Sequence, residues 1–183
     1  MSKLKAEISQ ETPFSGPHEE VLLNLIRTTD CLQRALQQTT RRWKITSTQY
    51  NVLRILRGAH PAGLPCSMIG DRMLTADPDV TRLVSRLKAA ELVRQERDKK
   101  DRRVVLTHIS QKGLELLGEM DEAVSRFPAE MLSHLGDTDL RSLITLLERA
   151  RAQCDSRLSP TCNGTVHPGP VTCDGAPKAS ERE

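Results

Sequence analysis

Aromatic residues are scarce in this sequence: one Trp, one Tyr and two Phe make up 2% of its 183 residues. A hydrophobic core built from it must therefore consist mostly of aliphatic side chains. Long apolar runs are missing too, so we expect no transmembrane helix, which would need about 18 consecutive apolar residues. The first 20 residues contain no apolar signal-peptide segment, and we expect a cytoplasmic protein with no membrane partner.

The motifs that identify many enzymes are also missing. The sequence contains no glycine-rich phosphate loop, no histidine-rich metal motif and no candidate Ser/His/Asp set. We therefore expect a protein that is not an enzyme and binds no cofactor.

The five cysteines do not follow a pattern typical of disulfides or of a metal site. Their number is odd and their spacing is irregular, which argues against a disulfide framework. The spacing of Cys154, Cys162, His167 and Cys173 does not match known zinc ligands. We therefore expect no bound metal.

Two cysteines nearer the N-terminus have different surroundings. Cys31 stands beside the apolar Leu32, which favours a buried and inert thiol. Cys66 stands at the start of a predicted helix, where exposure and the helix N-terminus would stabilise a thiolate. A regulator that senses oxidants or metals through its cysteines therefore stays open as an alternative function.

Apolar residues recur at helical spacing over most of the chain. The pattern predicts helices over 18–43, 47–58, 66–75, 78–91, 111–127 and 138–155. Capping residues precede three of them: Thr46 or Ser47, Asp77 ahead of Pro78, and Ser110. Pro128 should end or kink the fifth helix.

The same spacing predicts which side chains face inward. In the helix over 66–75, we expect Ile69, Met73 and Leu74 to be buried. In the helix over 138–155, we expect burial of Leu143 and Ile144 among others.

Between residues 92 and 109 the period becomes that of strands. Leu92–Arg97 and Arg102–Ile109 are predicted strands, and Asp98–Asp101 is the charged turn between them. Two Gly and two Pro between 58 and 65 predict a break. The sequence thus predicts a mainly α protein with a small β-hairpin.

Helices 66–75 and 78–91 have the lengths and the short connection of a helix-turn-helix. In that motif the second helix enters the major groove of DNA. The apolar positions of 78–91 leave four polar side chains on the opposite face: Thr81, Arg82, Ser85 and Arg86. The hairpin that follows would form a wing whose candidate DNA contacts are Arg97, Lys99, Lys100, Asp101, Arg102 and Arg103.

Charge supports the same interface. Residues 94–103 contain six basic and three acidic side chains, in a chain whose net charge is only +3. Such a patch indicates an anionic partner, here duplex DNA. For each segment taken alone, an alternative remains open. The charged patch could be a solvated basic loop, and the helix over 78–91 could be an ordinary amphipathic helix. Asp77 and Asp79 would either repel phosphates, cap the helix or accept a hydrogen bond from cytosine.

Residues 46–113 resemble the MarR family of winged helix-turn-helix transcriptional regulators. The resemblance rests on Thr48-Gln49-Tyr50, Ile69–Met73, Val80–Leu87, Asp101-Arg102-Arg103 and Ile109–Gly113. It implies that Arg82 and Arg86 occupy recognition-helix positions. It also implies that Arg103 enters the minor groove while Asp101 orients it.

Three positions depart from the family pattern. Glu91 stands where a Gly commonly precedes the first wing strand, and Pro65 replaces a hydroxyl cap. Ile109-Ser110 stands in place of Leu-Thr and keeps a capping hydroxyl.

The resemblance implies a homodimer on a near-palindromic operator, released or tuned by a small ligand, and we expect a repressor. Tyr50, Trp43 and Arg27 are candidates to line the ligand pocket. The expected organisation is a flexible lead-in over 1–17, dimerisation helices over 18–45 and 111–156, a winged-helix DNA-binding domain over 46–110, and a disordered Pro/Gly-rich tail over 157–183.

Overall fold

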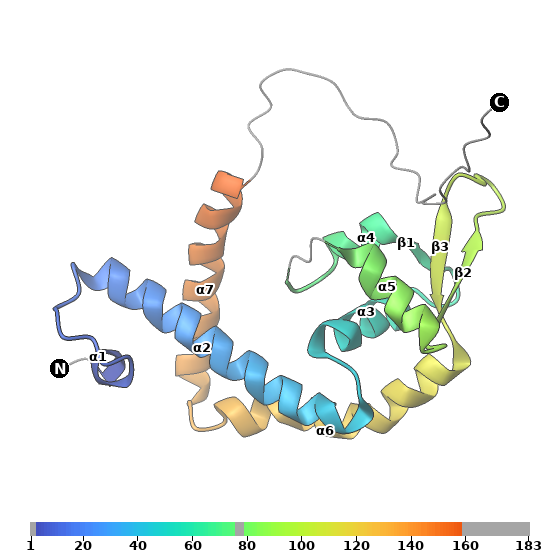
Figure 1. Cartoon of the computed structure of the whole chain (residues 1–183). Helices are drawn as coiled ribbons and strands as arrows, with labels where there is room; N and C mark the ends of the chain where they lie inside the picture. The colour runs from blue at the N-terminus through green and yellow to red at the C-terminus, as the bar shows by residue number, and fades with distance from the viewer. Residues whose placement is uncertain (1–2, 76–78, 159–183) are drawn as a thin grey trace, which may run out of the picture. The chain divides into compact units, whose positions relative to one another are not determined.

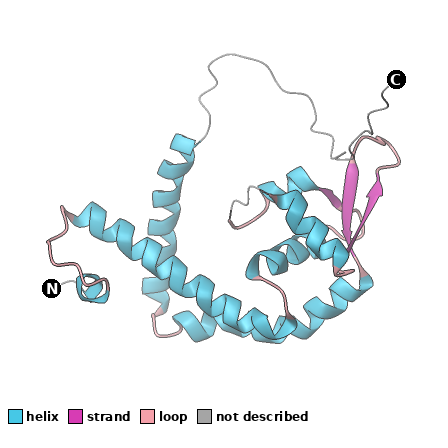
Figure 2. Ribbon diagram, in the orientation of Figure 1, coloured by secondary structure: helices cyan, strands magenta, loops and turns pink. Residues whose placement is uncertain are grey.

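The computed structural model describes residues 3–75 and 79–158, without the side chains of 155–158. The chain divides into two compact units, Met1–Ser133 and His134–Glu183. The first unit is mostly helical with one small sheet, as Figures 1 and 2 show. The predicted fold class, mainly α with a β-hairpin wing, is confirmed.

The order of elements follows the predicted order closely. The first unit contains α1 (Lys3–Glu7), α2 (Pro17–Thr40), the 3-10 helix η1 (Arg41–Trp43), α3 (Ser47–Gly58), β1 (Leu64–Pro65), α4 (Cys66–Asp71), α5 (Val80–Ala89), β2 (Val93–Arg97), β3 (Val105–Ile109) and α6 (Gln111–Leu132). The second unit contains α7 (Asp137–Leu158). The helix α1, with its buried Leu4, lies within the stretch expected to be a flexible lead-in.

Helix α3 begins as its capping residues predict. The Thr46 side chain accepts a hydrogen bond from the Gln49 backbone N–H, while the Gln49 side chain accepts one from the Thr46 backbone. This reciprocal pair is a capping box, and it satisfies two backbone donors that the first helical turn leaves open. Thr46 and not Ser47 is therefore the cap.

Helix α4 is shorter than predicted. It ends at Asp71, and Arg72 closes it by donating its backbone N–H to Gly70 and Ile69. Ile69 is fully buried as expected, but Met73 is only half-buried and Leu74 is 81% exposed. The prediction for Leu74 was wrong because the helical period stops before that residue.

Helix α5 begins later and ends earlier than predicted. Its cap is Asp79, whose carboxylate accepts from the Arg82 backbone N–H at 2.9 Å. The predicted cap Asp77 and first helical residue Pro78 lie outside the described residues. A cap at Asp79 favours the capping role over the other roles considered for this carboxylate.

The sheet has three strands in the order β1-β3-β2, all antiparallel. In the hairpin, Val93 pairs with Ile109 and Arg97 pairs with Val105. The two-residue strand β1 lies on the other side of β3 and was not predicted. It falls in the Gly/Pro-rich stretch that was interpreted as a break.

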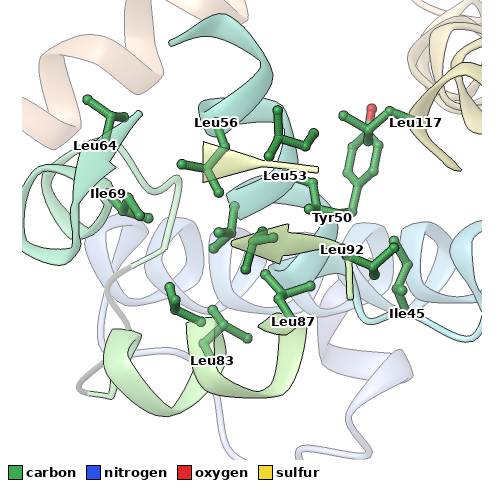
Figure 3. Packing of buried hydrophobic residues seen from close by; sticks show 14 of the residues in the cluster. Ile45, Tyr50, Leu53, Leu56, Leu64, Ile69, Leu83, Leu87, Leu92 and Leu117 are labelled. Carbon is green, nitrogen blue, oxygen red and sulfur yellow. The ribbon is translucent and has the colours of Figure 1, made fainter. Parts of the chain in front are cut away.

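An aliphatic core lies between α3, α4, α5, the sheet and α6 (Figure 3). Fully buried side chains come from each of these helices: Val52, Leu53, Leu56, Ile69, Val84, Leu87, Leu117 and Met120. Burying such side chains supplies most of the favourable free energy of folding. Tyr50 is the one aromatic side chain of this core and is 6% exposed.

Helix α6 runs through Pro128 and ends only at Leu132. A proline removes one helical hydrogen bond but need not end a helix. The four residues that follow, Ala129–Leu132, are all strong helix formers. The prediction that the helix spans 111–127 was therefore too short.

Helix α7 spans Asp137–Leu158, so it begins within one residue of the predicted start and extends three residues beyond the predicted end. Its side chains Leu143, Ile144 and Leu146 are 38%, 55% and 58% exposed in the single chain. The expected burial of Leu143 and Ile144 is therefore not found within the protomer. Of the predicted tail over 157–183, only the backbone of residues 157 and 158 is described, as the end of α7.

Candidate nucleic-acid interface

Helix α5 has one buried and one exposed face. Leu83, Val84 and Leu87 are at most 7% exposed and hold the helix on the core. The four predicted contact residues, Thr81, Arg82, Ser85 and Arg86, are all exposed. Helix α5 thus packs on the core through an aliphatic face and presents a polar and basic face to solvent.

The outer face of α5 is partly organised by local hydrogen bonds. The Ser85 hydroxyl donates to the Thr81 carbonyl oxygen at 2.9 Å. Among the described residues, no ion pair holds the Arg86 guanidinium. Its donors are thus available for a fork-shaped contact, such as the one arginine makes with guanine O6 and N7.

The wing carries the other predicted contacts at its tip. Arg97, Lys99, Lys100, Asp101, Arg102 and Arg103 are exposed. The structure therefore brings all ten predicted site residues to exposed positions on α5 and on the hairpin that follows it.

Two aspartates shape the turn at the wing tip. The Asp98 carboxylate accepts from the Lys100 backbone N–H at 2.6 Å, and the Asp101 carboxylate accepts from the Arg103 backbone N–H at 3.0 Å. The Val104 backbone N–H then donates to the Asp101 carbonyl oxygen. Asp101 therefore orients the backbone at Arg103 in the free protein, not its guanidinium.

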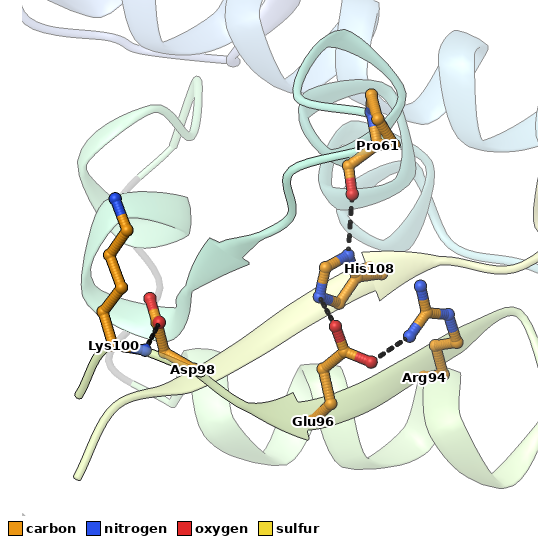
Figure 4. A network of polar contacts seen from close by, with 6 residues as sticks. All are labelled: Pro61, Arg94, Glu96, Asp98, Lys100 and His108. Carbon is orange, nitrogen blue, oxygen red and sulfur yellow. Dashed lines mark hydrogen bonds and ion pairs between the residues drawn. The ribbon is translucent and has the colours of Figure 1, made fainter. Parts of the chain in front are cut away.

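Not every basic residue of the patch is available. The Arg94 guanidinium pairs with the Glu96 carboxylate on the same strand (Figure 4). Lys88 lies 3.4 Å from the Gln95 side-chain oxygen. The free positive charge of the patch is therefore concentrated at the outer face of α5 and the wing tip.

The turn that joins α5 to β2 is tightly constrained. Glu91 has a φ of 63°, a left-handed conformation that favours glycine. The Ser110 hydroxyl donates to the Glu91 carbonyl oxygen at 2.7 Å and accepts from the Gly113 backbone N–H at 3.0 Å. Lys112, through a hydrogen bond and its charge, holds the pKa of the Glu91 carboxyl below its usual value.

The departure at Glu91 thus keeps the backbone shape that glycine serves in the family pattern. The predicted cap at Ser110 is confirmed, and so is the lack of a side-chain cap at Pro65.

Sequence reasoning missed two residues that shape the interface. The Asn51 side-chain oxygen accepts from the Leu74 backbone N–H at 3.0 Å and so holds the chain just after α4 against α3. His108 is 5% exposed and links the loop before β1 to β2. Both contacts join residues far apart in the chain, so no local pattern reveals them.

The three candidate ligand residues lie in different surroundings. Tyr50 belongs to the hydrophobic core, where burial raises the pKa of its hydroxyl. Trp43 is half-buried under the Arg42 guanidinium, which lies 3.7 Å from its ring centre, and Arg27 is exposed. A hollow of about 260 Å³ is instead lined by Thr39, Arg42, Glu122, Ala123, Arg126 and Glu130.

Cys31 is exposed, so the prediction of a buried thiol was wrong. It follows Asp30 and precedes the half-buried Leu32 on α2, and one residue turns a helix by about 100°, which points Cys31 outward. Cys66 is half-buried at the start of α4, and Cys154 is exposed. Cys162, His167 and Cys173 lie outside the described residues.

The described part of the chain contains no group of three or more His, Cys, Asp or Glu side chains placed to hold a metal ion. In the same residues, no helix combines the length and the apolar character that crossing a bilayer requires.

A helix-turn-helix whose inner face is buried, followed by the basic β2–β3 hairpin of a three-stranded sheet, defines a winged-helix DNA-binding fold. The family model described as MarR family matches residues 43–104. The chain is 30% identical over 105 residues to the HTH-type transcriptional regulator MhqR of Bacillus subtilis, covering 57% of this chain and 71% of that protein. The chain belongs to the MarR family of transcriptional regulators.

Solved structures agree with this assignment. A MarR transcription factor from Planctomyces limnophilus is 36% identical, with a TM-score of 0.57, and covers 74% of this chain and 98% of its own. A mutant MarR from E. coli complexed with operator DNA has a TM-score of 0.65 at 23% identity, over 74% of this chain and 99% of its own. This second similarity supports the fold alone.

Proposed function

We propose that this MarR-type regulator binds a specific, near-palindromic operator as a homodimer and represses the adjacent promoter by occupying it. One observation carries the proposal: the outer face of α5 exposes Thr81, Arg82, Ser85 and Arg86 while its other face is locked in the core. Such a helix fits the major groove, where arginine and hydroxyl side chains distinguish base pairs.

The wing supplies the second part of the contact. Its exposed basic tip lies in the hairpin directly after α5, and it suits the phosphate backbone or the adjacent minor groove. Contacts with phosphates give affinity and salt dependence, whereas contacts of α5 with bases give sequence preference.

Apolar side chains left exposed in the single chain support a homodimer. On α2, Val21, Leu22 and Ile26 are each 57% exposed. On α7, Leu143, Ile144 and Leu146 are also exposed. Exposed apolar patches of this kind mark association surfaces, and a two-fold dimer presents two copies of α5 to half-sites about one DNA turn apart.

A small effector completes the proposal. The hollow between α2 and α6 contains Arg42 and Arg126 together with Glu122 and Glu130. It offers charged groups of both signs to a small molecule, which fits a polar effector better than an apolar one. We assign no catalytic step to the protein, because its family consists of transcriptional regulators.

One observation favours a second candidate, a thiol-responsive regulator. The Cys31 sulfur is exposed on α2 and lies 3.7 Å from the Arg34 guanidinium. Cys31→Ser should abolish any oxidant effect on DNA binding if this thiol is the sensor. An oxidant effect that persists in the variant would remove Cys31 from the proposal.

The main test is binding to duplex DNA selected by genome-wide mapping of bound sites. Arg86→Ala should cost about 1–3 kcal/mol of specific binding free energy, which weakens the affinity for the selected site about 5-fold to 150-fold. Arg151→Ala on α7 removes the same charge from an exposed position outside the proposed interface and serves as the matched control. Equal effects of the two substitutions would show that α5 does not read the operator.

A further inference from the structure

Polar side chains connect helix α3 to two neighbouring helices, one near each of its ends. Helix α3 follows η1 in the chain and packs on both α2 and α6 (Figure 1). It also packs on α5. Helix α3 therefore stands between α2, which carries exposed apolar side chains, and the helix proposed to contact bases. The position of α5 relative to α2 depends on how firmly α3 is held.

The first connection is made by Gln37, near the C-terminal end of α2. Its side-chain oxygen accepts from the Ser47 backbone N–H at 3.0 Å, and its side-chain nitrogen lies 3.5 Å from the Ile45 carbonyl oxygen. An amide side chain offers one acceptor and one donor group, and each faces its complement here. Ser47 is the first residue of α3, where the backbone N–H has no partner within the helix. Gln37 thus holds the start of α3 on α2.

The second connection lies in the last turn of α3. The Arg57 nitrogen Nη1 lies 2.9 Å from both carboxylate oxygens of Asp121 on α6. The two side chains are 37% and 50% exposed, so the pair contributes little to stability by itself. It joins two elements that are far apart in the chain, however, and it opposes movement of the end of α3 away from α6.

The hydrophobic contacts around α3 leave room for such movement. Leu53 and Leu56 of α3 belong to the same buried cluster as Leu117 and Met120 of α6. The hydrophobic effect has no preferred direction, whereas hydrogen bonds require a defined distance and angle. Polar contacts at both ends of α3 therefore restrict a pivot of the helix that the aliphatic core alone would resist less.

A two-fold dimer would connect this restriction to DNA. In a dimer formed through α2, the separation of the two copies of α5 depends on the path from α2 through α3 to α5 in each protomer. One additional base pair between half-sites moves them apart by about 3.4 Å and rotates them by about 35°. A rigid path cannot follow this change, and a dimer that engages one half-site loses the contribution of the other.

We propose that Gln37, Arg57 and Asp121 are positioning residues that determine which half-site spacing the protein accepts in its operator. This inference rests on the proposed function, a homodimer bound to a near-palindromic site. The three side chains act through α3, which packs on α5, and not through contacts with bases. Their loss should broaden the range of accepted spacings and should not weaken binding to every duplex alike.

The test measures affinities of the full-length protein for the mapped operator and for duplexes whose half-sites are one or two base pairs closer or farther apart. At fixed salt, the wild type should prefer the mapped spacing over a change of one base pair by about 100-fold, because both half-sites are engaged only there. In Gln37→Ala/Asp121→Asn, this ratio should fall about 5-fold to 20-fold, since one hydrogen bond and one exposed ion pair no longer hold α3.

The matched control is Gln38→Ala/Glu119→Gln, which removes one amide and one carboxylate from exposed positions of α2 and α6. It should keep the wild-type ratio. A general loss of stability would weaken binding to every spacing alike, so the ratio separates positioning from a merely structural role. If the double variant folds poorly, Asp121→Asn alone changes an exposed side chain and should still lower the ratio about 2-fold to 5-fold.

Two kinds of failure can be told apart. An unchanged ratio in the folded variants, or a wild type that accepts all spacings equally, would overturn this proposal alone. A wild type that prefers no duplex sequence, or that sediments as a monomer on its operator, would overturn the proposed function as well.

Discussion

Replacing Gly113 with alanine should destabilise the protein and disturb the wing. Gly113 lies in the first turn of α6, and a Cβ there would be 2.8 Å from the Ile109 Cγ1 atom and closer still to the Leu92 carbonyl oxygen. Distances of this size require the backbone to shift, because a carbonyl oxygen cannot rotate away as a flexible side chain can. The same oxygen accepts a hydrogen bond from the Ser110 backbone N–H at 3.0 Å.

The magnitude follows from three opposing contributions. Overpacking costs about 1–3 kcal/mol. Weakening the hydrogen bond to Leu92 costs about 1 kcal/mol more. The higher helix propensity of alanine returns about 1 kcal/mol. Gly113→Ala should therefore lower the free energy of unfolding by about 1–3 kcal/mol, measured by equilibrium denaturation at a fixed protomer concentration.

Gly118 offers a matched control on the same helix. It is exposed, and a Cβ added there would meet no atom within 4 Å. Gly118→Ala should raise the free energy of unfolding by about 0.5–1 kcal/mol through helix propensity alone. The same chemical change thus has opposite signs at two sites five residues apart. Equal stability of the two variants would refute the close packing of α6 against the start of β2.

Three further predictions concern local structure. Glu91→Gly should raise the melting temperature by about 2–4 °C, because glycine relieves the left-handed backbone at φ 63°. The exposed ion pair with Lys112, which this change removes, contributes little. A lower melting temperature in a thermal scan would contradict this prediction. Thr46→Ala should cost about 1 kcal/mol of stability in denaturant titrations through loss of the capping box, whereas a stability unchanged within error would show that the cap contributes nothing. Asn51→Ala should weaken operator binding more than Asn51→Asp, because aspartate keeps an oxygen that accepts from the Leu74 backbone N–H. Equal operator affinities of the two variants in fluorescence titrations would count against a positioning role of Asn51.

The elements that sequence patterns predicted well are those whose signals are local. Helix α3 is marked by Thr46 and Gln49 three residues apart, and α5 by four aliphatic positions on one side. The turn signals around the wing tip are likewise contained within a few residues. For these segments, the residue order alone carries the physical information that determines the structure.

The features that were missed depend on tertiary contacts. Strand β1 has only two residues, and one of them is Pro65, so it forms because β3 lies beside it. The contact of His108 with Pro61 joins residues 47 apart, and that of Asn51 with Leu74 joins residues 23 apart. Leu74 is exposed because α4 ends at Asp71, before that residue. Periodicity alone does not define such a helix boundary sharply.

The most direct test of the central claim is a missing-contact measurement on the operator. Affinities of the wild type and of Arg86→Ala are measured against every single base-pair substitution of one half-site at fixed salt. If α5 lies in the major groove, the variant should lose discrimination at one or two neighbouring base pairs and keep it elsewhere, since each bidentate contact is worth about 1–3 kcal/mol at its own base pair. Undiminished discrimination at every position in both Arg86→Ala and Arg82→Ala would contradict the account.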